Sequence, residues 1–397
     1  MGMIRCVIVA LVVSQRLPES KQSPMAFPQD YDALLVSSAT KVTADVLKAG
    51  GKHLKLVGQR GKWVDNIDVE QATRQGIVVV NSPTSNDRSV AEFTCAMLLN
   101  VARHLPQAHC SVKQGEWNRK VHVGNELHGK TLAIIGLGRT GHLVAECMQG
   151  FGMKIIGYDP YVSPATALTF GVEHKPLDTI WPLADYITVH VPLWDSTRDL
   201  INASVLSKCK PNVRLVNCAR GGIINETDLL AALDGDHVAG AALDVYEQEP
   251  SMNQALIDHP RVICTPHIMA NTDEAQERVA IELAEDIVAL NQGNGLTGAI
   301  NAAPMIASVD TFNRAWLIAA ENLTRMACML NLAARSFSVA FPIELQKITK
   351  ALTAAVSMGY LQAHDKDWGL AHSVNVLNAE IIADDINVKV GMFRCSR

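Results

Sequence analysis

The chain has 397 residues, of which 48% are hydrophobic and 19% are charged. This length and this apolar content predict a folded globular protein of two or three domains. The formal net charge of −5 comes from acids and bases that are interspersed along the sequence, so no basic face for a phosphate backbone stands out. We therefore expect no nucleic-acid partner.

Cysteine usage and the N-terminal run bear on the compartment. The nine cysteines are an odd number and show neither C-x-x-C pairs nor zinc-ligand spacing. They predict free thiols in a reducing compartment and no metal site, so we expect a cytoplasmic protein. No small-residue cleavage site follows the apolar run at residues 6–13, which favours a buried first strand over a signal peptide. No stretch approaches the ~18 apolar residues of a membrane helix, and we expect no membrane partner.

In chain order, the first expected strands lie at residues 32–38, 54–58 and 77–81 and predict a small α/β domain. A helical pattern at 89–103 follows and is expected to connect this domain to the next one. Six β-rich apolar runs then alternate with helices, at 131–136, 154–158, 186–191, 213–218, 238–243 and 262–265. Their continuous apolar character is typical of a parallel sheet covered by helices on both faces. A second long helix at 273–290 can return to the first domain, and the Ala-rich stretch after 301 predicts a helical tail.

A glycine-rich turn follows the run at 131–136. Gly136, Gly138 and Gly141 form a G-x-G-x-x-G pattern before an expected helix, and Asp159 ends the next strand. The first glycine permits a tight turn, the second lets the backbone approach a pyrophosphate, and the third lets the helix pack on the strand. Asp159 can accept the ribose hydroxyls and would repel a 2′-phosphate. The pattern predicts NAD rather than NADP, and a glycine turn that packs without a ligand is the structural alternative.

Three polar residues, Arg220, Glu249 and His267, follow later strands at the sheet edge where open α/β sheets bind ligands. Oxidising a secondary alcohol needs a base for the hydroxyl proton, and a histidine can serve near neutral pH. A carboxylate beside it favours the charged imidazole, while a guanidinium can bind a substrate carboxylate and polarise the reacting oxygen. Taken singly, each residue has an ordinary interpretation as a surface charge, a loop acid or a structural histidine. Together, after a dinucleotide motif, they predict a catalytic group.

Four motifs resemble the D-2-hydroxyacid dehydrogenase family. They are Gly-Leu-Gly-Arg-x-Gly at 136–141, Asn-Cys-Ala-Arg-Gly-Gly at 217–222, Ala-Leu-Asp-Val-Tyr-x-x-Glu-Pro at 242–250 and Cys-Thr-Pro-His at 264–267. Within the family, the segments 38–43, 151–154 and 296–298 are similar to the branch that oxidises a phosphorylated 2-hydroxy acid. The resemblance covers residues 32–301 closely and the tail more loosely.

The resemblance implies an NAD-dependent oxidoreductase that takes a small 2-hydroxy acid as substrate. Its catalytic residues would be Arg220, Glu249 and His267, with His267 as the proton donor in the reductive direction. Cofactor contacts would come from Gly136, Gly138, Arg139, Thr140, Gly141, Asp159, Val191, Cys218, Ala219, Arg220, Asp244, His267 and Ala270. Substrate contacts would come from Ser38, Gly61, Lys62, Asn86 and Arg220.

The resemblance also implies an α/β domain organisation. A Rossmann-like NAD-binding domain at 94–271 would be inserted into a smaller flavodoxin-like substrate-binding domain at 1–93 and 272–303. A partial C-terminal domain of the allosteric type would follow at 304–397. The first domain looks shortened, because the interval from residue 13 to residue 32 has room for one crossover and not two. The family further implies a homo-oligomer, either a dimer or a tetramer.

Several positions depart from the family pattern. In the loop at 58–66, Lys62 replaces a threonine and Trp63 replaces a glycine, and a bulky residue would strain a backbone that needs a positive φ. Ser37 stands where an arginine is expected to meet a substrate phosphate, and Met269 stands where a glycine is expected. These changes keep two alternatives open: an enzyme for another acid, of the glyoxylate or hydroxypyruvate type, and an NAD-binding pseudoenzyme that acts through protein contacts.

Overall fold

The computed structural model describes residues 6–8, 31–37, 40–307, 310–330, 335–364 and 374–394. The chain folds into two compact units, one formed by Asn86–Gln276 and the other by Met1–Ser85 together with Glu277–Arg397. Most of the interval in which the sequence predicts a shortened crossover lies outside the described residues, as does Ser38. The functions expected of the separate domains stay predictions.

The unit Asn86–Gln276 is built on seven parallel strands in the order β11-β10-β9-β8-β5-β6-β7. They are β5 (Thr131–Ile135), β6 (Lys154–Tyr158), β7 (Glu173–His174), β8 (Tyr186–Val189), β9 (Val213–Asn217), β10 (Val238–Leu243) and β11 (Val262–Cys264). The strand order reverses between β5 and β8. In open α/β sheets such a reversal opens a ligand crevice at the carboxyl ends of the strands.

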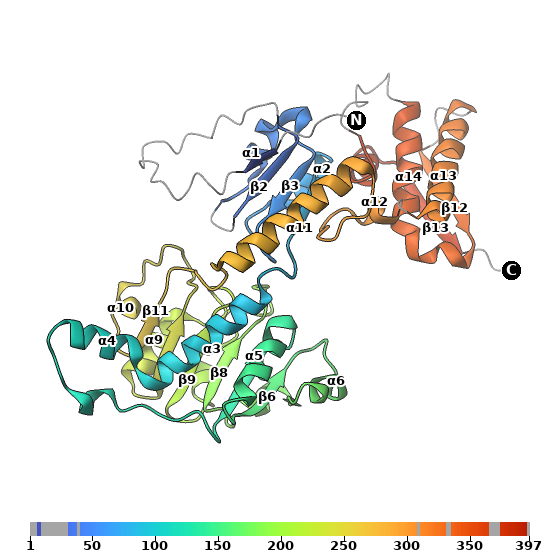
Figure 1. Ribbon diagram of the computed structural model, residues 1–397. Coiled ribbons are helices and arrows are strands. Elements are labelled where there is room, and N and C mark those ends of the chain that lie inside the picture. Colours follow the sequence, from blue (N-terminus) through green and yellow to red (C-terminus); the bar gives the residue numbers. More distant parts are fainter. Residues whose placement is uncertain are drawn as a thin grey trace. The chain divides into compact units, whose positions relative to one another are not determined.

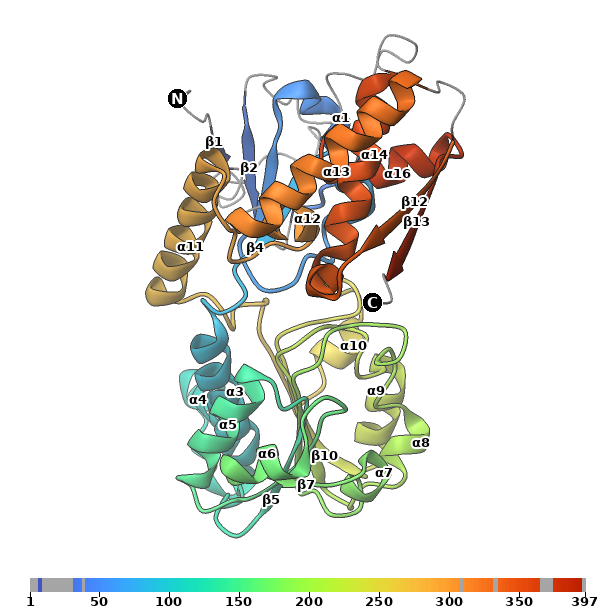
Figure 2. The ribbon, with the colours of Figure 1, turned by 90° about the vertical axis from the view of Figure 1, so that its right-hand side faces the viewer.

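Helices cover both faces of this sheet, which Figure 2 shows edge-on. One face carries α3 (Asp87–Arg103), α5 (Arg139–Gln149) and α6 (Pro164–Thr169), and the other carries α7 (Leu177–Ile180), α8 (Ala203–Leu206), α9 (Glu226–Asp234) and α10 (Gln254–Ile257). An apolar core lies on each face of the sheet, and alternate strand residues pack into one core or the other. Leu132 and Ile134 pack with α3 and α5, whereas Ala133 packs with α8 and α9. Burial on both faces explains why these strands read as continuous apolar runs.

An arm, defined here as residues 104–124, leaves the unit at the end of α3. His104 ends that helix in the left-handed region, at φ 53°, and α4 (Leu105–Lys113) and the short helix η4 (Arg119–His122) follow. After the arm the chain comes back to the C-terminal end of α3, where the Asn125 N–H donates to the Ala102 carbonyl at 2.9 Å. The arm, which includes α4, is drawn in teal in Figure 1, and its Trp117 is 81% exposed.

The other unit contains a four-stranded parallel sheet in the order β1-β2-β3-β4. The strands are β1 (Cys6–Ile8), β2 (Ala33–Val36), β3 (Leu56–Gln59) and β4 (Val78–Asn81), and the helices beside them are α1 (Ala44–Ala49), η3 (Gly51–His53), α2 (Val69–Arg74), α11 (Asp273–Gln292) and α12 (Ala303–Ala307). One core lies between the sheet and α1 and α2. On the opposite face, Val279 and Leu283 of α11 pack against the strands.

The C-terminal part of this unit corrects one prediction, because the tail is not wholly helical. It contains α13 (Thr311–Leu330), η5 (Ile343–Ile348), α14 (Thr349–Ala363) and α16 (Ala379–Asp385), but also β12 (Ser336–Phe341) and β13 (Lys389–Arg394), which pair in parallel. The sequence of β12, Ser-Phe-Ser-Val-Ala-Phe, carries the alternation of a half-buried strand, which the Ala-rich composition of the whole tail obscured. Leu377 packs against the four-stranded sheet, and an ion pair of Arg74 on α2 with Asp385 joins the same two parts.

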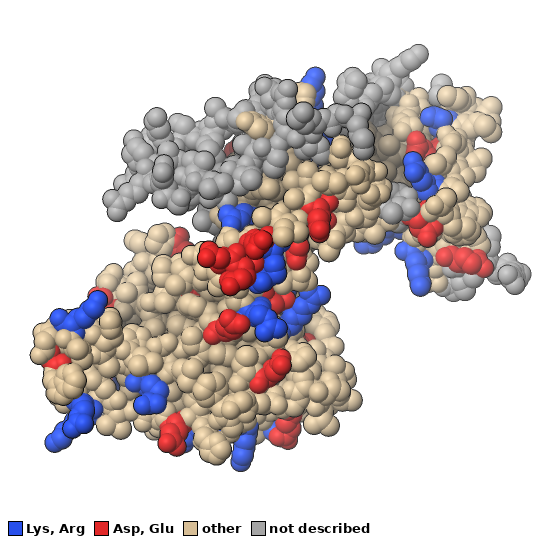
Figure 3. Space-filling view, viewed as in Figure 1, with Lys and Arg blue, Asp and Glu red and all other residues tan. Residues whose placement is uncertain are grey.

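The nine strands predicted between residues 32 and 265 are all present, with ends shifted by at most two residues. The strand β7 was missed because two residues are too few to show a pattern. Among the described residues, no helix combines the length and apolarity needed to span a membrane. On the face drawn in Figure 3, acidic and basic side chains are interspersed.

Candidate active site

The glycine turn after β5 is shaped by close backbone packing. Gly136 has φ 97°, and a Cβ there would stand 2.6 Å from the His190 carbonyl oxygen. A Cβ at Gly141 would overlap the Gly136 carbonyl, whereas a Cβ at Gly138 would meet no atom within 4 Å. The backbone at Gly138 therefore borders open space at the N-terminus of α5, where free N–H groups favour an anion. This cradle fits the pyrophosphate of a dinucleotide.

Asp159 closes the same region at the end of β6. Its carboxylate accepts the Leu137 N–H at 2.9 Å and the Tyr161 N–H at 2.8 Å, which fixes it beside the glycine turn. Thr140, which the sequence assigns to the cofactor, donates its hydroxyl to Asp87 at 3.0 Å. Arg139, the first residue of α5, is exposed. The turn, the acid and the helix N-terminus therefore lie together, while their contacts with the cofactor stay predictions.

The Arg220 loop is held against the loop that carries Glu249. Asn217 binds its own loop twice, donating to the Arg220 carbonyl at 2.8 Å and accepting from the Ala219 N–H at 3.0 Å. A Cβ at Gly221 would overlap the Tyr246 carbonyl, so only a glycine allows the two backbones to touch. The Ala-Arg-Gly-Gly motif thus places Arg220 beside the segment that ends at Glu249.

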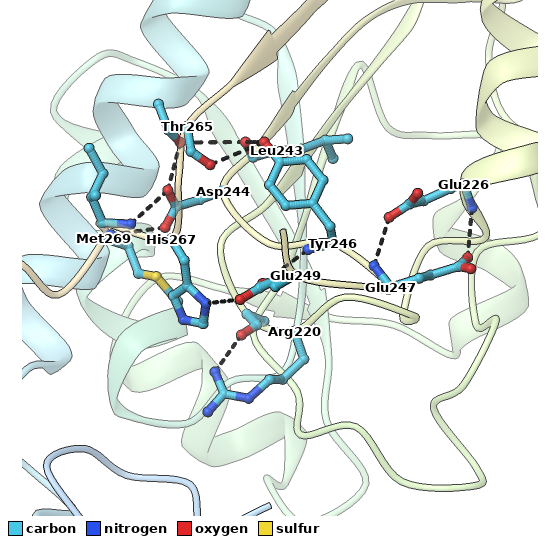
Figure 4. Close-up of polar contacts among 12 residues, drawn as sticks. Arg220, Glu226, Leu243, Asp244, Tyr246, Glu247, Glu249, Thr265, His267 and Met269 are labelled. Carbon is cyan, nitrogen blue, oxygen red and sulfur yellow. Dashed lines mark hydrogen bonds and ion pairs between the residues drawn. The ribbon is translucent and has the colours of Figure 1, made fainter. Parts of the chain in front are cut away.

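His267 and Glu249 form a direct pair. The Nδ1 atom of His267 lies 2.7 Å from Oε2 of Glu249, and Oε1 accepts the Tyr246 N–H at 3.2 Å. Burial alone would raise the pKa of Glu249, but the hydrogen bond and charge of His267, with help from Arg220, hold that pKa below its ordinary value. Figure 4 shows the three side chains grouped together. The structure thus brings together three residues that follow three different strands, while their catalytic roles stay predictions.

A buried carboxylate fixes the segment that carries His267. Asp244 is fully buried, and it accepts the Thr265 hydroxyl at 2.6 Å and the N–H groups of Ile268 and Met269, each at 2.9 Å. These bonds, drawn in Figure 4, bracket His267, whose φ is 54°. All hydrogen bonds described for the Asp244 carboxylate are with the segment Thr265–Met269. The cofactor contact expected for Asp244 therefore stays a prediction, whereas its role in shaping the loop is plain.

Sequence reasoning missed two residues that support this loop. Thr265 is one, and the other is Tyr246, whose hydroxyl donates to the Leu243 and Thr265 carbonyls at 3.2 and 3.1 Å. Both stand inside the quoted motifs, so their signal was present, but a hydroxyl that binds backbone leaves no spacing pattern. Met269, which replaces an expected glycine, is 6% exposed and packs in the core beside α3.

The remaining candidates of this unit lie along the same strand ends. Val191 borders Gly136, and Cys218 and Ala219 follow β9 in the core. Burial raises the pKa of the Cys218 thiol above its ordinary value. Ala270 follows the His267 segment, and Asn86 is the N-cap of α3. No group of three or more metal-binding side chains occurs among the residues that the structure describes.

The altered loop at 58–66 belongs to the other unit and is well bonded there. Ser82 N–H donates to the Gly61 carbonyl at 3.0 Å, and the Asn81 side chain donates to the Lys62 carbonyl. Gly61 has φ 150°, but Trp63 is not among the non-glycine residues with positive φ, so the strain expected at Trp63 is absent. The Lys62 ammonium instead lies 5.3 Å from the centre of the Trp63 ring.

The comparisons with known proteins agree with this geometry. The family model for the NAD-binding domain of D-isomer specific 2-hydroxyacid dehydrogenases matches residues 95–269. The chain belongs to this family of NAD-dependent dehydrogenases. Among the relatives it resembles, D-3-phosphoglycerate dehydrogenase of Rattus norvegicus is 45% identical over 96% of this chain and 71% of the relative. The enzyme of that name from Bacillus subtilis (strain 168) is 48% identical over 69% of this chain and 52% of its own length.

Solved structures give the same fold. D-lactate dehydrogenase from Aquifex aeolicus, complexed with NAD and lactic acid, matches with a TM-score of 0.62 and 29% identity, over 71% of this chain and 87% of that one. The apo form of D-lactate dehydrogenase from Escherichia coli matches with a TM-score of 0.64 and 27% identity, over 68% and 86% of the two chains. The cofactor of this chain is NAD, as the glycine turn and Asp159 predict.

Proposed function

We propose that the protein catalyses the NAD-dependent oxidation of D-3-phosphoglycerate to 3-phosphohydroxypyruvate, the first step of the phosphorylated route to serine. The observation that carries the chemistry is the contact of 2.7 Å between His267 and Glu249, beside Arg220. The substrate is supported by the 45% identity with D-3-phosphoglycerate dehydrogenase over nearly the whole chain. NAD supplies the acceptor for the hydride that leaves C2 of the alcohol.

His267 is the base of the proposed reaction. With Nδ1 engaged by the Glu249 carboxylate, the neutral ring carries its hydrogen on Nδ1 and its lone pair on Nε2. Nε2 can then take the hydroxyl proton while the C2–H bond breaks, and it returns that proton in the reductive direction. Glu249 fixes this tautomer and favours the imidazolium that forms.

Arg220 is proposed to bind the substrate. Its guanidinium can hold the carboxylate bidentately and stabilise negative charge on the C2 oxygen. Its loop is anchored by Asn217 and by the close approach at Gly221, so the backbone that carries the guanidinium is fixed before substrate arrives. For the other unit we keep Gly61 and Lys62 as candidate substrate contacts, together with Asn86 at the start of α3.

Binding of NAD is assigned to residues around the glycine turn. Gly138 and the N-terminus of α5 would take the pyrophosphate, and Asp159 the ribose hydroxyls. We propose further contacts from the flanking residues Gly136, Arg139, Thr140, Gly141, Val191, Cys218, Ala219 and Ala270. Asp244 is proposed to act through its hold on the His267 segment.

We also propose a homo-oligomer in the cytoplasm. The arm supports self-association, because the exposed side chains of Trp117, Val121 and Val123 are too apolar for an isolated surface segment. The seven cysteines that the structure describes with their side chains are all free thiols, which suits a reducing compartment. Light scattering after gel filtration tests the first proposal, since Trp117→Glu should lower the measured mass if the arm mediates association.

The substrate is tested by following NADH formation with D-3-phosphoglycerate and NAD, with a trap that removes the ketone. His267→Gln is the matched control, because it should keep the NAD site and lose turnover. Faster reduction of glyoxylate or hydroxypyruvate than turnover of the phosphorylated pair would assign another substrate. NADH binding without turnover of any of these acids would make the chain a pseudoenzyme.

A further inference from the structure

A cluster of four side chains, Tyr186, Arg214, His104 and His122, lies at the amino edge of the seven-stranded sheet. This edge is at the opposite strand ends from His267. Tyr186 begins β8, and Arg214 is its register partner on β9. Tyr186 packs in the core beneath α3, and Arg214 shares that face because the Arg214 guanidinium carbon lies 5.6 Å from the centre of the Tyr186 ring. Both are almost fully buried, at 1% and 9% exposure. A guanidinium thus stands in the core below the end of α3.

Both ends of the arm meet at this cluster. His104 follows α3 directly, and His122 lies two residues before Gly124, whose Cβ would overlap the Ala102 carbonyl. The two imidazoles are therefore held at one place although 18 positions separate them in the sequence. His104 interacts electrostatically with both Arg214 and His122: burial, then the charges of these two residues, lower the pKa of His104.

Three polar atoms of the cluster are buried and, among the described residues, have no hydrogen-bond partner. They are Nε of Arg214, the hydroxyl of Tyr186 and Nε2 of His122. The one hydrogen bond described for the Arg214 side chain runs from Nη1 to the Asn212 carbonyl, at 3.3 Å. A buried donor without an acceptor is costly, and a buried guanidinium more so because it stays charged.

The nearby carboxylate is already engaged. Asp185 accepts the Thr131 N–H at 2.8 Å and the Lys210 ammonium at 3.0 Å, and the charge of Lys130 also acts on it. The two groups whose charges act on His104, Arg214 and His122, are both basic. The cluster therefore presents excess positive charge and unused donors in an enclosed place, which is the chemistry of an anion site.

We propose that this cluster binds a small monovalent anion of halide size, held by Arg214, Tyr186 and His122 at the root of the arm. The unused atoms are sealed from solvent, which favours a compact ion over a phosphorylated metabolite. Because His104 and His122 stand at the two ends of the arm, the anion ties both ends to the sheet. The site is independent of the dehydrogenase chemistry, since it uses none of the residues proposed to act on NAD or substrate.

The test compares bromide with gluconate, an anion too large for the site, at constant ionic strength. The full chain in sodium gluconate should gain thermal stability saturably as bromide replaces gluconate, by about 4 °C near saturation. Arg214→Met should abolish the gain and Tyr186→Phe, which keeps the ring, should weaken it. Lys120→Met is the matched control, because it removes an exposed cation from the arm and should keep the full gain.

A bromide-soaked crystal gives the second readout, which does not depend on the charge variant folding. An anomalous peak should lie within hydrogen-bond distance of Arg214 Nε and weaken in Tyr186→Phe. A water molecule at that position that bromide does not displace would overturn the proposal. A peak that persists unchanged in Tyr186→Phe, or a linear stability response shared by every variant, would mark an adventitious ion only and would also overturn it.

Discussion

Two regions of the chain differ in how their side chains are held: the group around His267 and the loop at 58–66. His267 is bracketed by bonds to the fully buried Asp244, and the Arg220 loop touches the Glu249 loop through a glycine. The loop at 58–66 is held by backbone hydrogen bonds and by the Asn66 side chain, which donates to the Ser37 and Thr40 carbonyls at 3.1 and 2.8 Å. Its Lys62 and Trp63 side chains contact each other. The first region keeps the family's Arg220, Glu249 and His267, and Met269, which departs from the family pattern there, is absorbed by the core. In the second region the departures, Lys62 and Trp63, lie in the loop that the family implies for substrate.

The largest expected effect tests the first region. His267→Gln should lower kcat for D-3-phosphoglycerate oxidation by about 10³-fold, because general base catalysis typically supplies 10²–10⁴. NADH affinity, measured by fluorescence titration, should stay unchanged, since the imidazole acts on the substrate oxygen. Comparable losses of turnover and of NADH affinity would show that His267 supports the cofactor site instead.

The glycine contact gives the next prediction. Gly221→Ala should separate the Arg220 and Glu249 loops, and a displacement of about 1 Å can cost on the order of 100-fold in kcat/KM. Gly138→Ala is the matched control, because its Cβ meets open space: stability should be kept while NADH binds more weakly. If Gly221→Ala kept full activity, the two loops would not depend on each other.

The second region is tested by restoring the family pattern. Lys62→Thr and Trp63→Gly, together with Ser37→Arg for the substrate phosphate, should raise kcat/KM for D-3-phosphoglycerate by about tenfold, the effect of 1.4 kcal/mol of added binding. NADH affinity should not change. Steady-state kinetics on the original and the triple variant decide the matter: an original chain that already matches an ordinary dehydrogenase would mean that the altered loop serves the substrate as it stands.

The smallest expected effect concerns pH. Glu249→Gln should retain some activity but move the acid limb of the pH profile to lower pH, because an amide no longer favours the imidazolium. In the folded protein the pKa of Glu249 is lowered, so its ionisation stabilises the fold above the unfolded value of about 4.3, and this contribution is lost as pH falls through the folded pKa. The variant should therefore lose part of the acid sensitivity of unfolding. An unchanged rate profile would remove Glu249 from the pair.

Much of the fold could be predicted from the sequence because parallel strands buried on both faces leave continuous apolar runs. The strands β5 to β10 illustrate this, apart from β7. The pair β12 and β13 could not be predicted, because its partners lie about 50 residues apart and pairing across that distance depends on tertiary contacts. The arm was equally hidden, since its course depends on a return contact at Ala102.

The candidate site was predictable to the extent that its residues follow strand ends. Arg220, Glu249 and His267 belong to three separate loops, and the sheet brings those loops to one edge. The roles of Asp244 and Tyr246 depend on hydrogen bonds to backbone groups of another strand, which no spacing in the sequence reveals. Trp63 was expected to strain its loop, whereas the positive φ falls on Gly61.

The burial of Asp244 has a consequence for how the enzyme can be rebuilt. The segment around His267 lies at the surface, yet its amides at Ile268 and Met269 are bonded to a carboxylate with no exposure to water. In hydrogen-exchange measurements these amides should be protected like those of the central strands and unlike those of a surface loop. The backbone shape of the His267 segment therefore depends on the sheet through Asp244. A graft of this segment into another scaffold would have to include β10, which Asp244 follows.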